Sequence, residues 1–75
     1  MKLNNFTYIK DYRFMLFFEN GEKKEVDLSG LIKKHVDMQN IKSAEINREW
    51  GCLEFKGGMV DIDPKTLYRH AMQAE

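Results

Sequence analysis

The sequence lacks the features that mark secreted, membrane-spanning or disulfide-stabilised proteins. Its 75 residues include one cysteine, Cys52, so no disulfide can form within the chain. The longest apolar run, residues 14–18, is far shorter than the roughly 20 residues that cross a bilayer. Residues 1–10 have no apolar core of the length that a signal peptide needs. These absences together predict a soluble protein of the reducing cytoplasm.

An excess of charge of one sign is also missing. Twelve Lys and Arg residues balance twelve Asp and Glu residues, whereas proteins that bind nucleic acid usually carry a basic excess. A local basic patch remains an alternative, and its members would be Lys23, Lys24, Lys33, Lys34 and Lys42. Acidic residues alternate with these lysines, which favours a mixed, solvated surface over a site for phosphate groups.

Short length limits what the chain can bury. We expect a single domain over residues 1–75, and a domain of this size buries only about 60% of the surface that its unfolded chain exposes. The apolar fraction of 43% suffices for a core and excludes a disordered chain. Because small domains are marginally stable, association with a partner or with a second copy is expected.

The first half of the sequence predicts a hairpin followed by a helix. Residues 6–9 form a short first strand, and residues 12–18 form a stronger one in which the even-numbered residues are all apolar or aromatic. Asn20-Gly21 marks the next turn. A two-residue turn would place Val26 opposite Met15, whereas a type I turn with Gly21 as a bulge would place it opposite Phe14. We favour the second register because it puts Val26 on the apolar face.

A helix is expected to begin at Asp27-Leu28-Ser29, where two side chains can accept hydrogen bonds from free amides. Four of its residues recur at helical spacing: Leu28, Leu31, Ile32 and His35. Residues 36–42 are then expected to be an irregular connection, with room for one helical turn.

The second half predicts a three-stranded meander and a final helix. A hairpin at Gly57-Gly58 pairs Phe55 with Val60 and Leu53 with Ile62, so that apolar residues meet. A four-residue loop over residues 48–51 extends the same face and adds the pairs Ile46–Leu53 and Ala44–Phe55. The final helix has Asp63 as its N-cap, Pro64 as its first residue, and an apolar stripe made of Leu67, Tyr68, Ala71 and Met72.

The predicted fold is therefore α+β. It has a small antiparallel sheet of about five strands, made of the N-terminal hairpin plus the three-stranded meander, with two helices packed on it.

Three stretches resemble a known family: YRFMLFFENG at residues 12–21, VDLSGLI at 26–32 and GGMVDIDPKTLY at 57–68. Over nearly its whole length the chain resembles the bacterial family catalogued as domain of unknown function 2442. Phe55 stands where many members carry tryptophan. The resemblance implies a small α+β domain, found alone or fused to a helix-turn-helix domain. Some members are encoded beside another small protein in arrangements that look like toxin–antitoxin pairs. No catalytic residue is implied.

The residues that could carry chemistry lack the spacing that chemistry needs. Glu54, Asp61 and Asp63 could share a surface, yet a hard cation needs six or more converging oxygens. His35, His70 and Cys52 occur in none of the local patterns of zinc sites or of nucleophile–base pairs. We expect no catalytic residue, no metal and no cofactor, and hence no enzyme.

Three residues instead predict a contact with another protein: Met15, Phe17 and Trp50. Met15 and Phe17 point away from the face that carries Phe14, and Trp50 falls in a loop. Methionine and aromatic residues are enriched in interface cores. The alternative is that a helix or the first strand covers them. The sequence thus favours a protein-interaction domain, the binding or antitoxin-like half of a two-protein pair. The alternative is a nucleic-acid-associated accessory domain of a transcriptional regulator that uses the five lysines.

Overall fold

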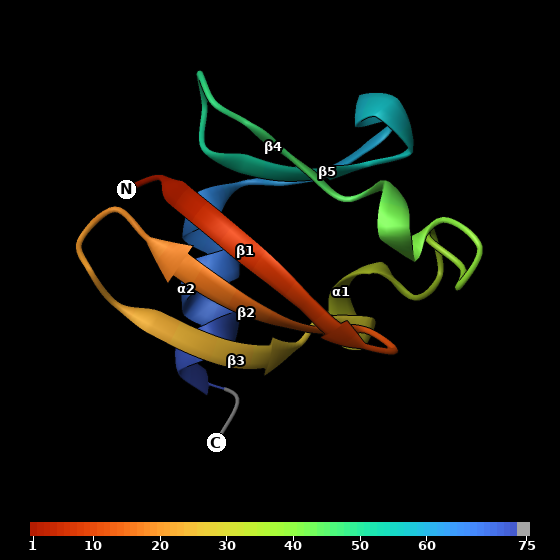
Figure 1. Cartoon of the computed structure of the whole chain (residues 1–75), viewed down its shortest axis with the longest axis horizontal. Coiled ribbons are helices and arrows are strands. Elements are labelled where there is room, and N and C mark those ends of the chain that lie inside the picture. Colours follow the sequence, from red (N-terminus) through yellow and green to blue (C-terminus); the bar gives the residue numbers. More distant parts are fainter. Residues whose placement is uncertain (74–75) are drawn as a thin grey trace.

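The computed structural model describes residues 1–73 and has the expected α+β class (Figure 1). Six strands, two α-helices and two short 3₁₀ helices follow in the order β1 (Leu3–Lys10), β2 (Arg13–Phe18), β3 (Lys23–Asp27), α1 (Ser29–Ile32), η1 (Ile41–Ser43), β4 (Glu45–Asn47), β5 (Cys52–Phe55), η2 (Lys56–Gly58), β6 (Val60–Ile62) and α2 (Pro64–Gln73). None of the helices in this part of the chain has the length and apolar character needed to cross a lipid bilayer.

The strands form two sheets rather than the single sheet of about five strands that the sequence predicted. One sheet has the order β1-β2-β3 and the other the order β4-β5-β6. The connection from β3 to β4 passes through α1 and η1 and carries the chain away from the first sheet. The meander therefore forms a separate three-stranded sheet. Where β1 begins, the Leu3 amide donates to the Gly51 carbonyl at 3.1 Å, in the turn between β4 and β5.

One hydrophobic core joins the two sheets to α2, which lies behind the first sheet in Figure 1. Phe14 and Phe55 come from different sheets, are both 0% exposed, and meet edge to face with their ring centroids 6.0 Å apart. From α2, Leu67 and Ala71 are fully buried. The predicted stripe on this helix is confirmed, and Tyr68 and Met72 pack at its margin.

The register of the first hairpin follows the favoured alternative. Val26 pairs with Phe14, and Gly21, at φ +92°, donates its amide to the Phe18 carbonyl at 3.0 Å. The first strand is longer than the predicted residues 6–9, because pairing with β2 continues on both sides across two register shifts. Long-range pairing thus overrides the low strand propensity of Asn4 and Asn5.

The first helix is shorter than its sequence spacing predicted, since α1 ends at Ile32 and does not reach His35. The Val36 carbonyl accepts the Tyr12 hydroxyl at 2.7 Å, and the amide of Asn40 bonds the carbonyl and side chain of Asp37. Backbone bonds of the helical type still run to Val36, whose amide donates to the Ile32 carbonyl at 2.8 Å. Beyond Val36, the bonds to Tyr12 and Asp37 take the place of further helical turns.

The meander has the predicted pairs Phe55–Val60, Leu53–Ile62 and Ile46–Leu53. The predicted pair Ala44–Phe55 does not form, because β4 begins at Glu45. Instead, the Ser43 hydroxyl accepts the Lys56 amide at 2.8 Å.

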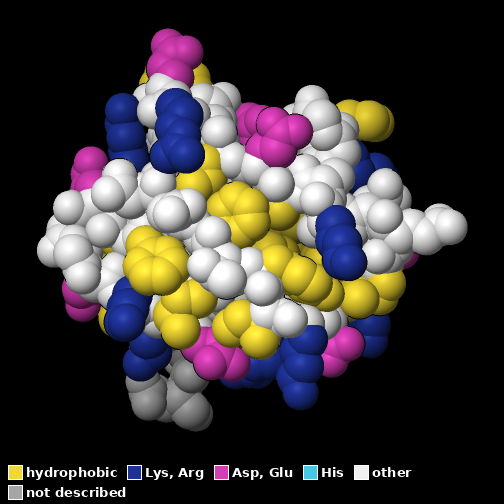
Figure 2. Space-filling model, in the orientation of Figure 1, with side chains coloured by type: hydrophobic (Ala, Val, Ile, Leu, Met, Phe, Trp, Pro, Cys, Tyr) yellow, Lys and Arg dark blue, Asp and Glu magenta, His cyan; other side chains and the backbone are white. Residues whose placement is uncertain are grey.

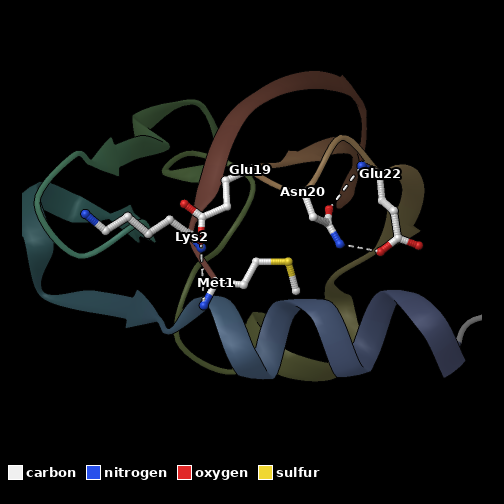
Figure 3. Close-up of polar contacts among 5 residues, drawn as sticks. All are labelled: Met1, Lys2, Glu19, Asn20 and Glu22. Carbon is white, nitrogen blue, oxygen red and sulfur yellow. Dashed lines mark hydrogen bonds and ion pairs between the residues drawn. The ribbon is translucent and has the colours of Figure 1, made fainter.

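Polar contacts tie the turn between β2 and β3 to the start of the chain (Figure 3) and to α2. The Lys2 amide donates to the Glu19 carboxylate at 2.9 Å, and the Glu19 amide donates to the Lys2 carbonyl at 3.0 Å. Glu22 accepts from the Asn20 side chain at 2.7 Å and from the Tyr68 hydroxyl of α2 at 2.5 Å. These two bonds lower the pKa of Glu22, and the Glu22 carboxylate raises the pKa of Tyr68.

Replacing Thr66 by alanine is expected to weaken the acid dependence of stability. The Thr66 hydroxyl donates to the Asp63 carboxylate, and this bond is the largest cause of the lowered pKa of Asp63. A carboxyl whose pKa is lowered by folding stabilises the fold above its unfolded pKa of about 3.9, and this stabilisation is lost as the pH falls through the folded value. Urea unfolding of the wild type, Thr66→Ala and Thr66→Ser at pH 7 and below pH 4 checks this. Only Thr66→Ala should lose less stability on acidification, and equal losses in all three proteins would contradict the prediction.

Candidate interaction surface

The face of the first sheet that points away from the core carries two of the three predicted contact residues. Met15 and Phe17 alternate on β2 with the buried Phe14 and Leu16, so they lie on the opposite face, and both are half-buried. Helix α2 packs on the core face, as the contact of Tyr68 with Phe18 shows. We call the outward side chains of β1, β2 and β3 the outer face.

Figure 2 looks onto the outer face and shows hydrophobic side chains gathered across its middle, with charged side chains at its borders. On β1, Asn5 stands opposite Phe17 and Thr7 stands opposite Met15. Small polar side chains at these two positions leave the apolar groups of β2 partly exposed. The same strand adds Ile9, which is 40% exposed.

On the β3 side, charged residues flank the two apolar side chains. Lys23 stands opposite Phe17 and Glu25 opposite Met15. Glu25 also forms an ion pair with Arg13 of β2, with 2.9 Å between Nε and the carboxylate oxygen. The outer face therefore has an apolar centre along β2 and a border that carries both signs of charge, as interfaces with other proteins commonly do.

Trp50, the third predicted contact residue, lies apart from Met15 and Phe17. It is 64% exposed in the turn between β4 and β5, which forms one extremity of the molecule, beyond the start of β1 (Figure 1). The Asn47 side chain shapes this turn by accepting the amides of Glu49 and Trp50 at 3.0 and 3.2 Å. A partner that touches all three residues must extend from the outer face past the start of β1.

The five lysines that could form a basic patch are spread over different surfaces. Lys23 points to the outer face, whereas Lys24 stands opposite the buried Leu16 and so points to the other face of the sheet. Lys42 lies in η1. Only Lys33 and Lys34 come together, in a hollow of about 380 Å³ that is lined by Ser29, Gly30, Leu31, Lys33, Lys34 and His35.

The titratable residues singled out by sequence lie in different settings. The Nε2 atom of His70 is 2.9 Å from the Asp27 carbonyl oxygen, and His35 is exposed and lines the hollow. Cys52 is a free, half-buried thiol whose pKa is raised by burial first and by nearby carboxylates second, which disfavours the reactive thiolate.

The carboxylates stand in a row across the second sheet. Glu45 pairs with Glu54, and Glu54 pairs with Asp61, on the side of the sheet opposite Leu53. Asp63 instead serves α2, where it accepts the Thr66 hydroxyl. Within residues 1–73, no three His, Cys, Asp or Glu side chains are arranged to hold a metal ion.

Ile9 is an exposed apolar residue of β1 that reasoning from the sequence missed. It lies at the register shift between Tyr8 and Lys10 and has no partner on β2, so its period-2 spacing from Thr7 and Asn5 was the available signal.

One protein-family model matches residues 3–73, and its description is protein of unknown function, DUF2442. No curated protein and no solved structure matches the chain.

Proposed function

The chain belongs to the DUF2442 family, and because that description assigns no activity, we propose a function from its surface. We propose a cytoplasmic, non-catalytic domain that binds another protein through the outer face of the first sheet. In this proposal the chain is the binding, antitoxin-like half of a two-protein pair. The gene arrangements of the family that the sequence resembles support the pairing.

A single observation carries the proposal: β2 is apolar on both faces, but within residues 1–73 only one face is fully buried. Phe14 and Leu16 are 0% exposed in the core, while Met15 and Phe17 are half-buried on the outer face. Strands with one solvated face normally alternate apolar with polar residues. Two large apolar side chains on the solvated face fit a surface that a partner covers.

The composition of the outer face indicates the kind of partner. Its apolar centre suits an apolar or aromatic surface. The ion pair of Arg13 with Glu25, and Lys23 beside it, suit a polar border with both signs of charge. Trp50 supplies a second, separate contact, since exposed tryptophan is enriched among the residues that dominate binding energy.

Replacing Phe17 by serine is expected to abolish capture of the partner. A tagged copy is purified from its native host at low salt, and recovered proteins are quantified by mass spectrometry. The wild type should recover one protein in near-equal amount, and Phe17→Ser should lower its recovery at least about tenfold, the equivalent of roughly 1.4 kcal/mol. Met59→Ser is the matched control because Met59 is 81% exposed in the turn before β6. Equal recovery by both variants would overturn the role of the outer face.

The hollow beside α1 favours a second candidate, the nucleic-acid-associated accessory domain. Lys33, Lys34 and His35 line it without an acidic side chain. In the same purification, this function requires that nucleic acid co-elute at low salt and dissociate in moderate salt. It also requires that Lys33→Glu with Lys34→Glu remove the nucleic acid while Phe17→Ser does not.

A further inference from the structure

Within residues 1–73, one long edge of strand β1 has no neighbouring strand. In the order β1-β2-β3 it pairs only with β2. The other edge is held only near its start, where the Leu3 amide meets the Gly51 carbonyl and the Arg48 side chain donates to the Asn4 carbonyl at 2.9 Å. Beyond Asn4 the second sheet contributes no paired strand.

The backbone groups that this edge presents can be identified from the hydrogen bonds. The Phe6 amide donates to the side chain of Asn5 at 2.9 Å, so it points away from β2. Register with β2 is uninterrupted from Asn5 to Tyr8, and antiparallel pairs alternate between bonded and non-bonded residues. The backbone of Tyr8 therefore also faces the open edge.

The central stretch of the open edge, from Asn5 to Tyr8, has no charged residue, no proline and no bulge. Exposed edge strands usually carry charged residues, proline or a bulge that prevents pairing with another chain. The six residues from Asn4 to Ile9 include neither charge nor proline. The register shifts flank the stretch from Asn5 to Tyr8 without interrupting it. Ile9 is 40% exposed beside this stretch.

We propose that two copies of this chain pair through their β1 edges, antiparallel about a two-fold axis near Thr7 and Tyr8. The two first sheets would then form one continuous six-stranded sheet, three strands from each copy. This contact uses the edge of the sheet rather than its outer face, so it stands independently of the function proposed above.

The sequence of β1 is complementary to itself in this arrangement. With the axis at Thr7, Phe6 lies opposite Tyr8 of the other copy and Lys10 lies opposite Asn4. With the axis at Tyr8, Thr7 lies opposite Ile9 and Lys10 lies opposite Phe6. Neither register places like charges together, and both place aromatic or β-branched residues in cross-strand contact, which stabilises sheets.

A second copy also suits the edge better than a flexible segment of another protein. Both β1 edges are already extended and fixed by β2, so pairing orders little additional backbone. A flexible peptide would lose far more conformational freedom on binding. A two-fold contact brings the same edge groups of both chains together at once.

Sedimentation velocity over a concentration series tests the proposal, with the pure, full chain as the sample. The expected particle has twice the monomer mass of 8.9 kDa at high concentration. Hydrogen exchange of the Phe6 and Tyr8 amides should slow as the concentration rises. Ile9→Lys should raise the dimer dissociation constant at least about tenfold, because each dimer carries two added charges at the contact. Met59→Lys, with the same charge change in the turn before β6, should not.

A monomer at all concentrations would overturn the proposal, as would a dimer whose Tyr8 amide exchanges at the monomer rate. Equal weakening by Ile9→Lys and Met59→Lys would also overturn it. So would protection of the Tyr8 amide only when a different protein is bound, which would assign the edge to that protein. Phe17→Ser should remain dimeric, which separates failure of this proposal from failure of the proposed function.

Discussion

Replacing Gly51 by alanine is expected to lower the free energy of unfolding by about 3 kcal/mol or more, a large share of the stability of so small a domain. Gly51 lies in the turn between β4 and β5 with φ +74°, where an L-residue costs about 1–2 kcal/mol. In addition, an alanine Cβ would stand 2.4 Å from the Cβ of Lys2 and 2.7 Å from its Cα. The Lys2 backbone is held in place, because it forms two hydrogen bonds with Glu19 and the next residue, Leu3, bonds to Gly51.

Gly57→Ala is the matched control, because its backbone is similar and its surroundings are empty. Gly57 has φ +67°, and nothing lies within 4 Å of an added Cβ. The Gly57→Ala variant should lose only the roughly 1 kcal/mol of unfolding free energy that an L-residue costs in a left-handed backbone conformation. Urea unfolding followed by circular dichroism measures both variants. Equal losses would show that the contact between Gly51 and Lys2 does not hold the two sheets together.

Replacing Phe55 by alanine is expected to destabilise the fold by about 3–5 kcal/mol, enough to unfold much of the population. Phe55 is 0% exposed and meets Phe14 of the first sheet edge to face, with 78° between the ring planes. Because its ring is a buried contact between the two sheets, its removal leaves a cavity that both sheets must shift to fill. Partial collapse around that cavity would lower the loss toward the smaller value.

Phe17→Ala is the control, because it makes the same substitution, phenylalanine to alanine, on the outer face. Phe17 is half-buried, lies opposite Asn5 and Lys23, and belongs to β2. Its loss should reduce the unfolding free energy by only about 1 kcal/mol, because the outer face is already partly hydrated. Thermal and urea unfolding at low protein concentration compare the two variants. A loss for Phe17→Ala as large as that for Phe55→Ala would mean that the outer face is part of the core.

The part of the candidate surface that lies on β2 could be predicted from the alternation of residues along the strand. The apolar even-numbered residues of β2 identify the core face, so Met15 and Phe17 must point the other way. The sequence could not place Trp50 relative to them, because the turn between β4 and β5 is joined to β1 by tertiary hydrogen bonds, from Leu3 to Gly51 and from Arg48 to Asn4. The predicted pairing of Val26 with Phe14 already turns Lys24 away from Lys23, whereas the positions of Lys33, Lys34 and Lys42 were decided only by the tertiary structure.

By itself, the sequence determined the local structure of this protein: the pairing of Val26 with Phe14, the meander around Gly57-Gly58, and the start of α2 at Asp63-Pro64. Turn geometry and alternation act over a few residues, so neighbouring residues are enough to specify them. Only the tertiary structure decided that there are two sheets, that α1 ends at Ile32, and that β1 keeps an open edge. Those outcomes depend on hydrogen bonds and packing between residues far apart in the chain, which no local pattern encodes.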